Sequence, residues 1–230
     1  MKAYTAEQIR TAEAPLIAAG VPLMQRAAHA LAEVISRELT ATGVRDRILI
    51  LAGPGSNGGD ALFAGAELAA RGHGVDILPV SSRIHEPGFQ AAQEAGAQVL
   101  ADLGSAALDI VAAATAAAPR AAVIVDGILG TGSAGRAALR GSAREVVAAL
   151  RDQDSGGSRP VVVAVDIPSG LDADRGTTDG IVLPAAVTVT CGACKVGLLT
   201  GEGPQLAGRI EVIDIGLGPA LAKLAPSLES

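Results

Sequence analysis

Three segments of the chain place glycines beside carboxylate, amide or hydroxyl side chains, each directly after a short apolar run. They cover residues 53–60 (GPGSNGGD), 126–136 (DGILGTGSAGR) and 166–172 (DIPSGLD). Glycines allow a backbone to approach an anion closely, and a helix that begins in such a segment offers unpaired N–H groups. Asp126 and Asp166 stand at matching positions, each as the first residue after its apolar run. These residue types could bind a phosphate, coordinate a cation or transfer a proton.

The apolar runs are typical of buried strands, and Ala-rich helical segments separate them. We expect strands at 47–52, 75–80, 97–100, 121–125, 161–165, 186–191 and 209–214, with helices near 60–71, 86–95, 105–117 and 141–151. This alternation predicts an α/β protein with a three-layer Rossmann-like fold, in which helices cover both faces of a mostly parallel sheet. Ligands of such sheets bind at the carboxyl ends of the strands, so the three segments are expected to form one site.

The length of 230 residues suits one hydrophobic core, and we expect a single domain over residues 1–230. A helical arm is predicted over 1–40, where Thr5 would cap a first helix and Pro22 would open a second. The α/β core is expected over 45–216. The remaining tail, 217–230, is expected to be a short helix or to be loosely ordered.

Composition argues against two classes of partner. The net charge is −6, and the chain has no Trp, one Tyr and two Phe, so neither a basic surface nor a stacking platform for nucleic acid is expected. The first residues are too polar for a signal peptide, and no apolar run approaches the roughly 18 residues of a membrane span. We expect a cytoplasmic protein that binds neither nucleic acid nor membrane.

A dehydrogenase is a formal alternative, because residues 53–58 satisfy G-x-G-x-x-G. That fingerprint requires an acidic residue at the end of the second strand, where it holds the ribose. Here the acid is Asp76, at the start of that strand, and no proton-transferring His or Tyr–Lys pair is evident. Residues 58–65 also loosely resemble the anion-hole motif of ribokinase-like enzymes, but that motif follows most of the sheet, whereas this one follows the first strand.

Taken together, the motifs resemble the YjeF N-terminal domain family, the NAD(P)H-hydrate (NAD(P)HX) epimerases. The matching segments are GPGSNGGDA at 53–61, VDGILGTG at 125–132, DIPSGLDAD at 166–174 and TVTCGACKVG at 188–197, and the N-terminal YTAEQIRTAE and PLMQRAA resemble the helical arm of the family. The chain departs from the family pattern at Ser56, Ala61, Gly127 and Ile128, and Glu13 stands where an Asp is common.

The resemblance implies an isomerase that interconverts the R and S forms of hydrated NADH and NADPH. It implies that Asn57, Asp126 and Ser169 bind one potassium ion per subunit, and hard cations do prefer such oxygen ligands. It also implies contact of Asp166 with the substrate. The other implied substrate-binding residues are Ser56, Asn57, Gly58, Gly59, Asp60, Gly130, Thr131, Gly132, Ser133, Ala134, Gly135 and Arg136.

The chemistry requires a hydroxyl on the reduced nicotinamide ring to be protonated, lost as water and added again from the other face. The ring nitrogen stabilises the intermediate cation, so one carboxyl group that carries a proton could suffice, and we assign that role to Asp166. The resemblance further implies a nucleotide-dependent dehydratase as functional partner, which would be a separate protein or part of a longer fusion. Family members are often dimers.

Three questions stay open at the level of sequence. Lys195 could reach a phosphate or a carboxylate of the site, or it could be a solvated lysine at a strand end. Cys191 and Cys194 form a C-x-x-C after a strand, without a second pair for zinc, which favours incidental small residues over a redox or metal site. The chain could also be a non-catalytic nucleotide-binding or scaffold module of the same fold, although it keeps Asp126, Asp166 and the glycines.

Overall fold

The computed structural model describes residues 1–43, 46–133, 137–153 and 159–229. In this part of the chain a seven-stranded sheet has the order β4 (Gln98–Val99), β3 (Gly74–Pro79), β2 (Arg47–Ala52), β5 (Val123–Gly127), β6 (Val161–Val165), β7 (Val187–Cys191) and β9 (Arg209–Ile213). Neighbouring strands run parallel, with Ile48 paired to Val75 on one side and to Val123 on the other. The predicted Rossmann-like sheet is confirmed.

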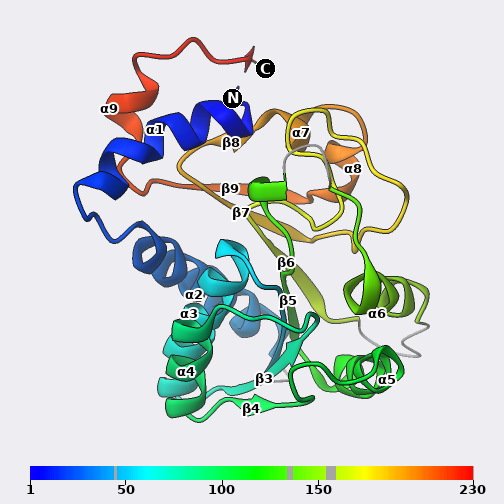
Figure 1. Cartoon of the computed structure of the whole chain (residues 1–230). Coiled ribbons are helices and arrows are strands. Elements are labelled where there is room, and N and C mark those ends of the chain that lie inside the picture. Colours follow the sequence, from blue (N-terminus) through cyan, green and yellow to red (C-terminus); the bar gives the residue numbers. More distant parts are fainter. Residues whose placement is uncertain (44–45, 134–136, 154–158, 230) are drawn as a thin grey trace.

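Helices cover both faces of this sheet (Figure 1). One face packs against α2 (Leu23–Thr42), α3 (Ser56–Ala70) and α4 (Glu86–Glu94), and the other against α5 (Ala107–Ala117) and α6 (Gly141–Asp152). Side chains alternate along a strand, so Ile48 and Ile50 of β2 enter the first core and Leu49 and Leu51 enter the second. The predicted three layers are therefore present, and α2, which we expected to be part of an arm, belongs to one of them.

Helix α1 (Ala6–Ala18) lies outside these layers, above the carboxyl ends of the strands (Figure 1). Its start is fixed by a capping box, in which Thr5 Oγ1 accepts from Gln8 N and Gln8 Oε1 accepts from Thr5 N. Ile9 and Ala12 are buried with Tyr4 and with residues that follow β9. Helix α1 is thus held in a defined position over the sheet.

A second, smaller sheet was not expected from the sequence. It contains β10 (Leu228–Glu229), β1 (Lys2–Tyr4) and β8 (Cys194–Lys195). Strands of two or three residues carry no periodic signal, and these three come from distant parts of the chain. The tail includes the expected short helix, α9 (Gly218–Leu221), but its β10 pairs with β1 and so joins the two ends of the chain.

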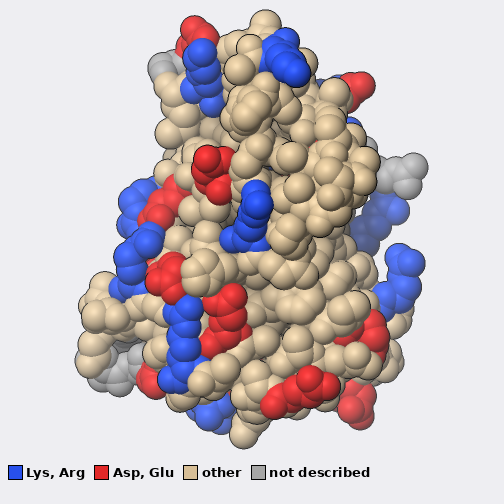
Figure 2. All heavy atoms as spheres, turned by 90° about the vertical axis from the view of Figure 1, so that its left-hand side faces the viewer, with Lys and Arg blue, Asp and Glu red and all other residues tan. Residues whose placement is uncertain are grey.

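The remaining short elements lie in the connections. They are η1 (Ala118–Arg120), η2 (Thr131–Ser133), α7 (Val196–Leu199) and α8 (Gly203–Leu206). No helix among the described residues is both long and apolar enough to cross a membrane. On the face drawn in Figure 2, acidic and basic side chains are interspersed. That face shows no basic stripe of the kind that binds nucleic acid.

Two details of the sheet bear on the site. The strand order reverses between β2 and β5, and this is the position at which doubly wound sheets bind ligands. Asp76 is buried at the amino end of β3, where it pairs with Arg47 at 2.5 Å. It is therefore far from the carboxyl edge, where a dehydrogenase would hold the ribose with an acidic residue.

Candidate functional site

A cavity of about 850 Å³ opens at the carboxyl edge of the sheet. Its walls come from α1, the start of α2, the segments around 54–57 and 128–132, and the residues that follow β6 and β7. This volume is within the range of cavities that hold small ligands and cofactors. The predicted convergence of the three glycine-containing segments is present, because each contributes to the cavity or to the cluster beneath it.

Asp126 and Ser169 form a hydrogen-bonded pair beneath the cavity. Asp126 has 0% exposure, and its carboxylate accepts from Ser169 N at 2.8 Å, from Ser169 Oγ at 2.6 Å and from Ile128 N at 3.3 Å. Burial raises the pKa of Asp126, and the bonds from Ser169 and Ile128 oppose that rise. Donors from two segments therefore converge on one fully buried carboxyl group.

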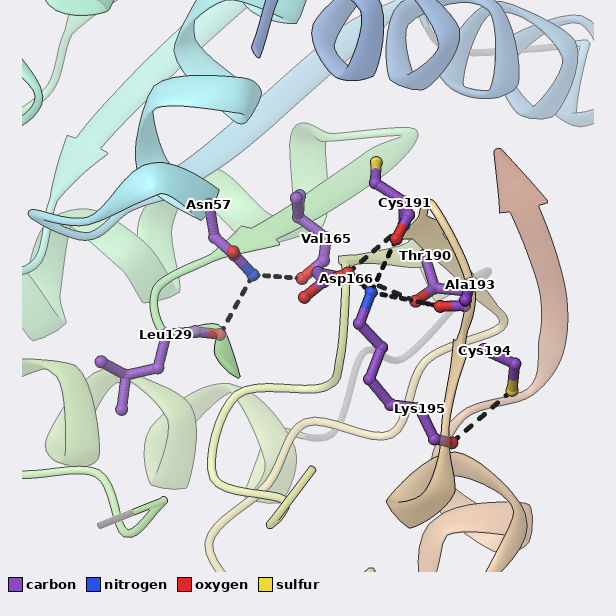
Figure 3. Close-up of polar contacts among 9 residues, drawn as sticks. All are labelled: Asn57, Leu129, Val165, Asp166, Thr190, Cys191, Ala193, Cys194 and Lys195. Carbon is purple, nitrogen blue, oxygen red and sulfur yellow. Dashed lines mark hydrogen bonds and ion pairs between the residues drawn. The ribbon is translucent and has the colours of Figure 1, made fainter. Parts of the chain in front are cut away.

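Asn57 lies in the first turn of α3, beside this pair. Its Nδ2 donates to Leu129 O at 3.3 Å and to Val165 O, so the amide links the ends of β5 and β6 (Figure 3). Its Oδ1 lies 2.1 Å from the position that a Cβ on Gly130 would take. Oxygen atoms of Asn57, Leu129 and Val165 thus gather near Asp126 and Ser169.

Asp166 and Lys195 form a second polar pair, next to the cavity (Figure 3). Lys195 is 1% exposed, and its ammonium group donates to Asp166 Oδ1, to Thr190 Oγ1 at 2.9 Å and to Cys191 O at 2.9 Å. Asp166 Oδ1 also accepts from Thr190 Oγ1 and from Cys191 N, both at 3.3 Å. Lys195 therefore holds a site carboxylate, and its interpretation as a solvated lysine is wrong.

The backbone of Asp166 is unusual, with φ of 69°. No other non-glycine residue in the described part of the chain has a positive φ. Asp and Asn adopt this region more readily than other side chains do, and such strain is often found at functional sites. All described hydrogen bonds of the side chain go to Oδ1, which leaves Oδ2 available to a ligand in the cavity.

Two further carboxyl groups line the same cavity, Asp60 of α3 and Glu13 of α1. Burial raises the pKa of Asp60 to about 8, and the negative charges of Asp166 and Glu13 add to the shift while Lys195 opposes it. The pKa of Glu13 is also raised, first by burial, with Lys195 opposing and Asp166 contributing. Three carboxyl groups therefore lie near one buried ammonium group, and Asp60 keeps its proton near neutral pH.

The glycines of the first segment serve backbone packing. A Cβ on Gly53 would lie 1.9 Å from Ile128 O, and one on Gly58 would lie 2.0 Å from Gly53 O. A Cβ on Gly59 would meet the ring of His85 at 2.9 Å. Helix α3 begins at Ser56 rather than near Asp60, because these glycines lie inside its first turns, where helix propensity alone does not predict them.

The predicted phosphate-binding residues lie partly within the described part of the chain. Ser56, Gly130, Thr131 and Gly132 line the cavity, and Arg10 Nη1 donates to Thr131 O at 3.3 Å. Ser133 is the last residue of η2. Predicted residues Ala134, Gly135 and Arg136 lie outside the described residues.

The two cysteines differ in position. Cys191 lines the cavity, and burial together with the charge of Asp166 raises the pKa of its thiol, which keeps it a poor nucleophile. Cys194 is buried in β8, and both thiols are free. Among the described residues, no group of three or more His, Cys, Asp and Glu side chains could hold a metal ion.

Sequence reasoning did not assign Glu13 and Arg10 to the site. Both lie on α1. The other site residues were predicted because they follow strands of the sheet, and a helix outside the sheet offers no such signal. The spacing of residues on α1 could have indicated this. Residues 9, 10, 13 and 17 share one helix face, which therefore combines Arg10 and Glu13 with apolar neighbours. The structure places that face on the cavity.

Replacing Asp60 by Asn is expected to stabilise the protein above neutral pH. In the folded chain the pKa of Asp60 is about 8 against an ordinary 3.8, so the folded state keeps a proton that the unfolded state has lost. Stability contributed by that proton is present below pH 4 and is lost as the pH rises to about 8. The variant removes this loss, and we expect its Tm to exceed that of the wild type by about 3 °C at pH 9.

Melting curves between pH 4 and 9 test this prediction. The exposed Asp102, changed to Asn, is the matched control and should melt like the wild type at every pH. A difference for Asp60→Asn that stays constant with pH would contradict the burial of a titrating carboxyl group.

Comparison with known proteins agrees with the motifs. The family described as YjeF-related protein N-terminus matches residues 20–197. An NAD(P)H-hydrate epimerase of Microbacterium testaceum is 47% identical over 226 residues, which cover 98% of this chain and 83% of that protein. A bifunctional NAD(P)H-hydrate repair enzyme of Mycobacterium tuberculosis is 38% identical over 221 residues, covering 93% of this chain and 41% of that protein. The crystal structure of yeast ynu0 shares the fold, with a TM-score of 0.70 at 21% identity, over 92% of this chain and 87% of that one.

Proposed function

The chain belongs to the family of YjeF-related protein N-termini, and from that premise we infer that it is an NAD(P)H-hydrate epimerase. It is then an isomerase that interconverts the R and S forms of hydrated NADH and NADPH in the repair of these nucleotides. The observation that carries this function is the buried Asp166–Lys195 pair, which presents a carboxylate to a nucleotide-sized cavity at the switch point of the sheet.

Asp166 is proposed as the catalytic group. Epimerisation requires a proton at the leaving hydroxyl and removal of a proton from the entering water, and a carboxyl group is suited to either transfer. Its Oδ1 is fixed by Lys195, Thr190 and the amide of Cys191, so Oδ2 is the atom that exchanges a proton with the substrate. The nearby carboxylate charge also stabilises the cationic ring that forms when water leaves.

The dinucleotide is proposed to lie along the glycine-containing segments. We propose Ser56, Asn57, Gly58, Gly59 and Asp60 as its first side. The start of α3 directs its N–H groups and a positive helix end toward the phosphates, although Gly59 N already donates to Gly55 O. We propose residues 130–136 as the second side, on the basis of the family resemblance, and Arg136, outside the described residues, is a cation of the type suited to pyrophosphate. Arg10 of α1, which contacts Thr131 O, is a further cation at this side.

A potassium ion is proposed at Asn57, Asp126 and Ser169. The donor set fits it, because amide, carboxylate, hydroxyl and backbone carbonyl oxygens are the ligands that hard cations prefer. Asp126 is completely buried, and within the described ranges no cationic side chain contacts it. A buried carboxylate without a countercharge is costly, so a cation there would stabilise the fold. When bound, the ion supplies positive charge beside the phosphate-binding segments.

Potassium is expected to raise the Tm of the protein, while sodium or lithium chloride at the same ionic strength raises it less. At a concentration 100-fold above its Kd, a bound ion contributes about 2.7 kcal/mol of stability. Thermal melts in the three chlorides measure this directly. In Asp126→Asn the difference between the salts should disappear, and equal melting of the wild type in all three would contradict the site.

The functional partner is proposed to be a nucleotide-dependent dehydratase that acts on the S form. Support comes from the bifunctional repair enzyme, of which this chain matches 41% of the length, so that protein has room for a second enzyme. Homodimer formation and a cytoplasmic location stay predictions of the sequence.

The epimerase activity is tested with R-hydrated NADH. Chromatography should show its conversion to the S form far faster than the spontaneous reaction. A rate equal to the spontaneous one would favour the alternative, a non-catalytic nucleotide-binding or scaffold module of the same fold.

A further inference from the structure

Inversion at a ring carbon places two demands on the site. The hydroxyl leaves from one face of the nicotinamide ring and water adds to the other face, so a proton must be given on one side and accepted on the opposite side. A carboxyl group transfers a proton only within hydrogen-bond reach. Asp166 is fixed by three hydrogen bonds on Oδ1 and can therefore serve one face. The second face needs another group.

Asp60 and Glu13 are the two other carboxyl groups that line the cavity. Asp60 follows Asn57 by three residues on α3, so the two side chains share one face of that helix. Asn57 itself donates to Val165 O, the residue directly before Asp166. Asp60 thus approaches the substrate from the same side as Asp166, along the sheet edge.

Glu13 comes from a different direction, since α1 lies above the carboxyl ends of the strands and outside the layers of the fold (Figure 1). Its carboxyl group makes no hydrogen bond or ion pair within the described residues, although it lines the cavity. Burial raises its pKa, and the charges of Lys195 and Asp166 also act on it. A half-buried carboxyl group that faces a ligand cavity without a protein partner is suited to exchange protons with the ligand.

Helix α1 is also positioned firmly enough for this role. Ala6 N donates to Asp174 Oδ1 at 2.7 Å, and Ile9 and Ala12 are buried at 4% and 1% exposure. Three residues before Glu13, on the same helix face, Arg10 contacts Thr131 O beside the phosphate-binding segments. One face of α1 therefore runs from the phosphate side of the cavity to the Asp166–Lys195 pair.

We propose that Glu13 is the second catalytic acid–base residue and serves the ring face opposite to Asp166. The proposal rests on the epimerase function. In one direction protonated Glu13 gives its proton to the hydroxyl, the C–O bond breaks, and the ring nitrogen lone pair forms the cation as water leaves. A water on the other face then forms the new C–O bond and loses its proton to the Asp166 carboxylate. Before the next turnover in the same direction, Asp166 releases its proton to solvent water and Glu13 takes one up from it, so water is the only other reactant needed.

Oxygen exchange separates this role from a structural one. Each purified isomer is incubated in H₂¹⁸O with the full chain, and chromatography with mass spectrometry gives both inversion and ¹⁸O uptake, corrected for the spontaneous reaction. In the wild type both isomers should invert and take up ¹⁸O. In Glu13→Gln we expect inversion to fall about 100-fold. Asp166 can still expel and return water on its own face, so exchange should persist in one isomer and be lost from the other.

Three variants complete the test. Glu7→Gln makes the same charge change on an exposed position of α1 and should behave as wild type. Glu13→Asp should restore part of the inversion. Asp60→Asn should keep the wild-type ratio of exchange to inversion.

Inversion at the wild-type rate in Glu13→Gln would overturn the proposal. So would a loss of ¹⁸O exchange that is equal for both isomers in this variant. Exchange confined to one isomer in Asp60→Asn, but not in Glu13→Gln, would assign the role to Asp60 and overturn the proposal as well. A wild-type chain that neither inverts nor exchanges contradicts the epimerase function itself.

Discussion

Asp166→Asn is expected to lower kcat by about 1,000-fold while KM changes little. Asn has nearly the same shape, and its carbonyl oxygen can accept the bonds that Asp166 Oδ1 accepts from Lys195, Thr190 and Cys191 N. Asn also tolerates the positive φ of 69° at this position, so the backbone is retained. What is lost is the group that carries a proton.

Steady-state epimerisation and nucleotide binding by calorimetry measure the two parameters separately. The exposed Asp102→Asn serves again as the control for loss of a charge. Near-full activity of Asp166→Asn would remove this residue from the chemistry. Loss of binding together with activity would instead indicate that Asp166 acts mainly by positioning the substrate.

The central residues of the site could be predicted because the ends of buried strands can be recognised in the sequence. Asp126 and Asp166 follow runs of Val and Ile, and such runs predict buried strands of a parallel sheet with little ambiguity. Once the sheet is known, its carboxyl edge fixes where both aspartates lie. The family resemblance then supplied the substrate, which no spacing of residues could have supplied.

Other parts depended on contacts between distant segments. Glu13 reaches the site only because α1 is held over the sheet by Tyr4, Ile9 and the residues after β9, and no local pattern encodes that docking. Lys195 is buried because β8 pairs with β1 in a sheet too short to show periodicity. The two interpretations of Lys195 could be separated only by its burial and its bonds.

The glycines of residues 53–60 belong to the site, as predicted, but their main role in the structure differs from the predicted one. The sequence alone predicts that these glycines serve the ligand, since glycine permits close approach of an anion. In the structure, a Cβ on Gly55 would meet no atom within 4 Å, whereas a Cβ on Gly53 or Gly58 would collide with backbone atoms. Their primary role is to let α3 start directly against the end of β2, which then places Asn57 and Asp60 in the site.

The variant Gly58→Ala distinguishes a role in packing from a role in ligand binding. In this variant helix propensity and steric overlap act on the free energy of unfolding in opposite directions. Ala favours a helix over Gly by about 1 kcal/mol, so propensity alone predicts stabilisation. The added Cβ would lie 2.0 Å from Gly53 O and 2.9 Å from Gly53 C, and backbone atoms cannot rotate away as a side chain can. Overpacking of this kind costs about 3 kcal/mol, so we expect a net loss of about 2 kcal/mol and a Tm lower by about 6 °C.

Gly55→Ala is the matched control, since a Cβ there meets no atom within 4 Å and φ is −96°. It should change the free energy of unfolding by less than about 1 kcal/mol. Urea unfolding of both variants without nucleotide tests packing independently of any ligand. If Gly58→Ala unfolds like the wild type yet binds nucleotide poorly, the glycine serves the substrate. A loss of stability confined to Gly58→Ala means that the motif first builds the junction between β2 and α3, and that nucleotide binding depends on that junction.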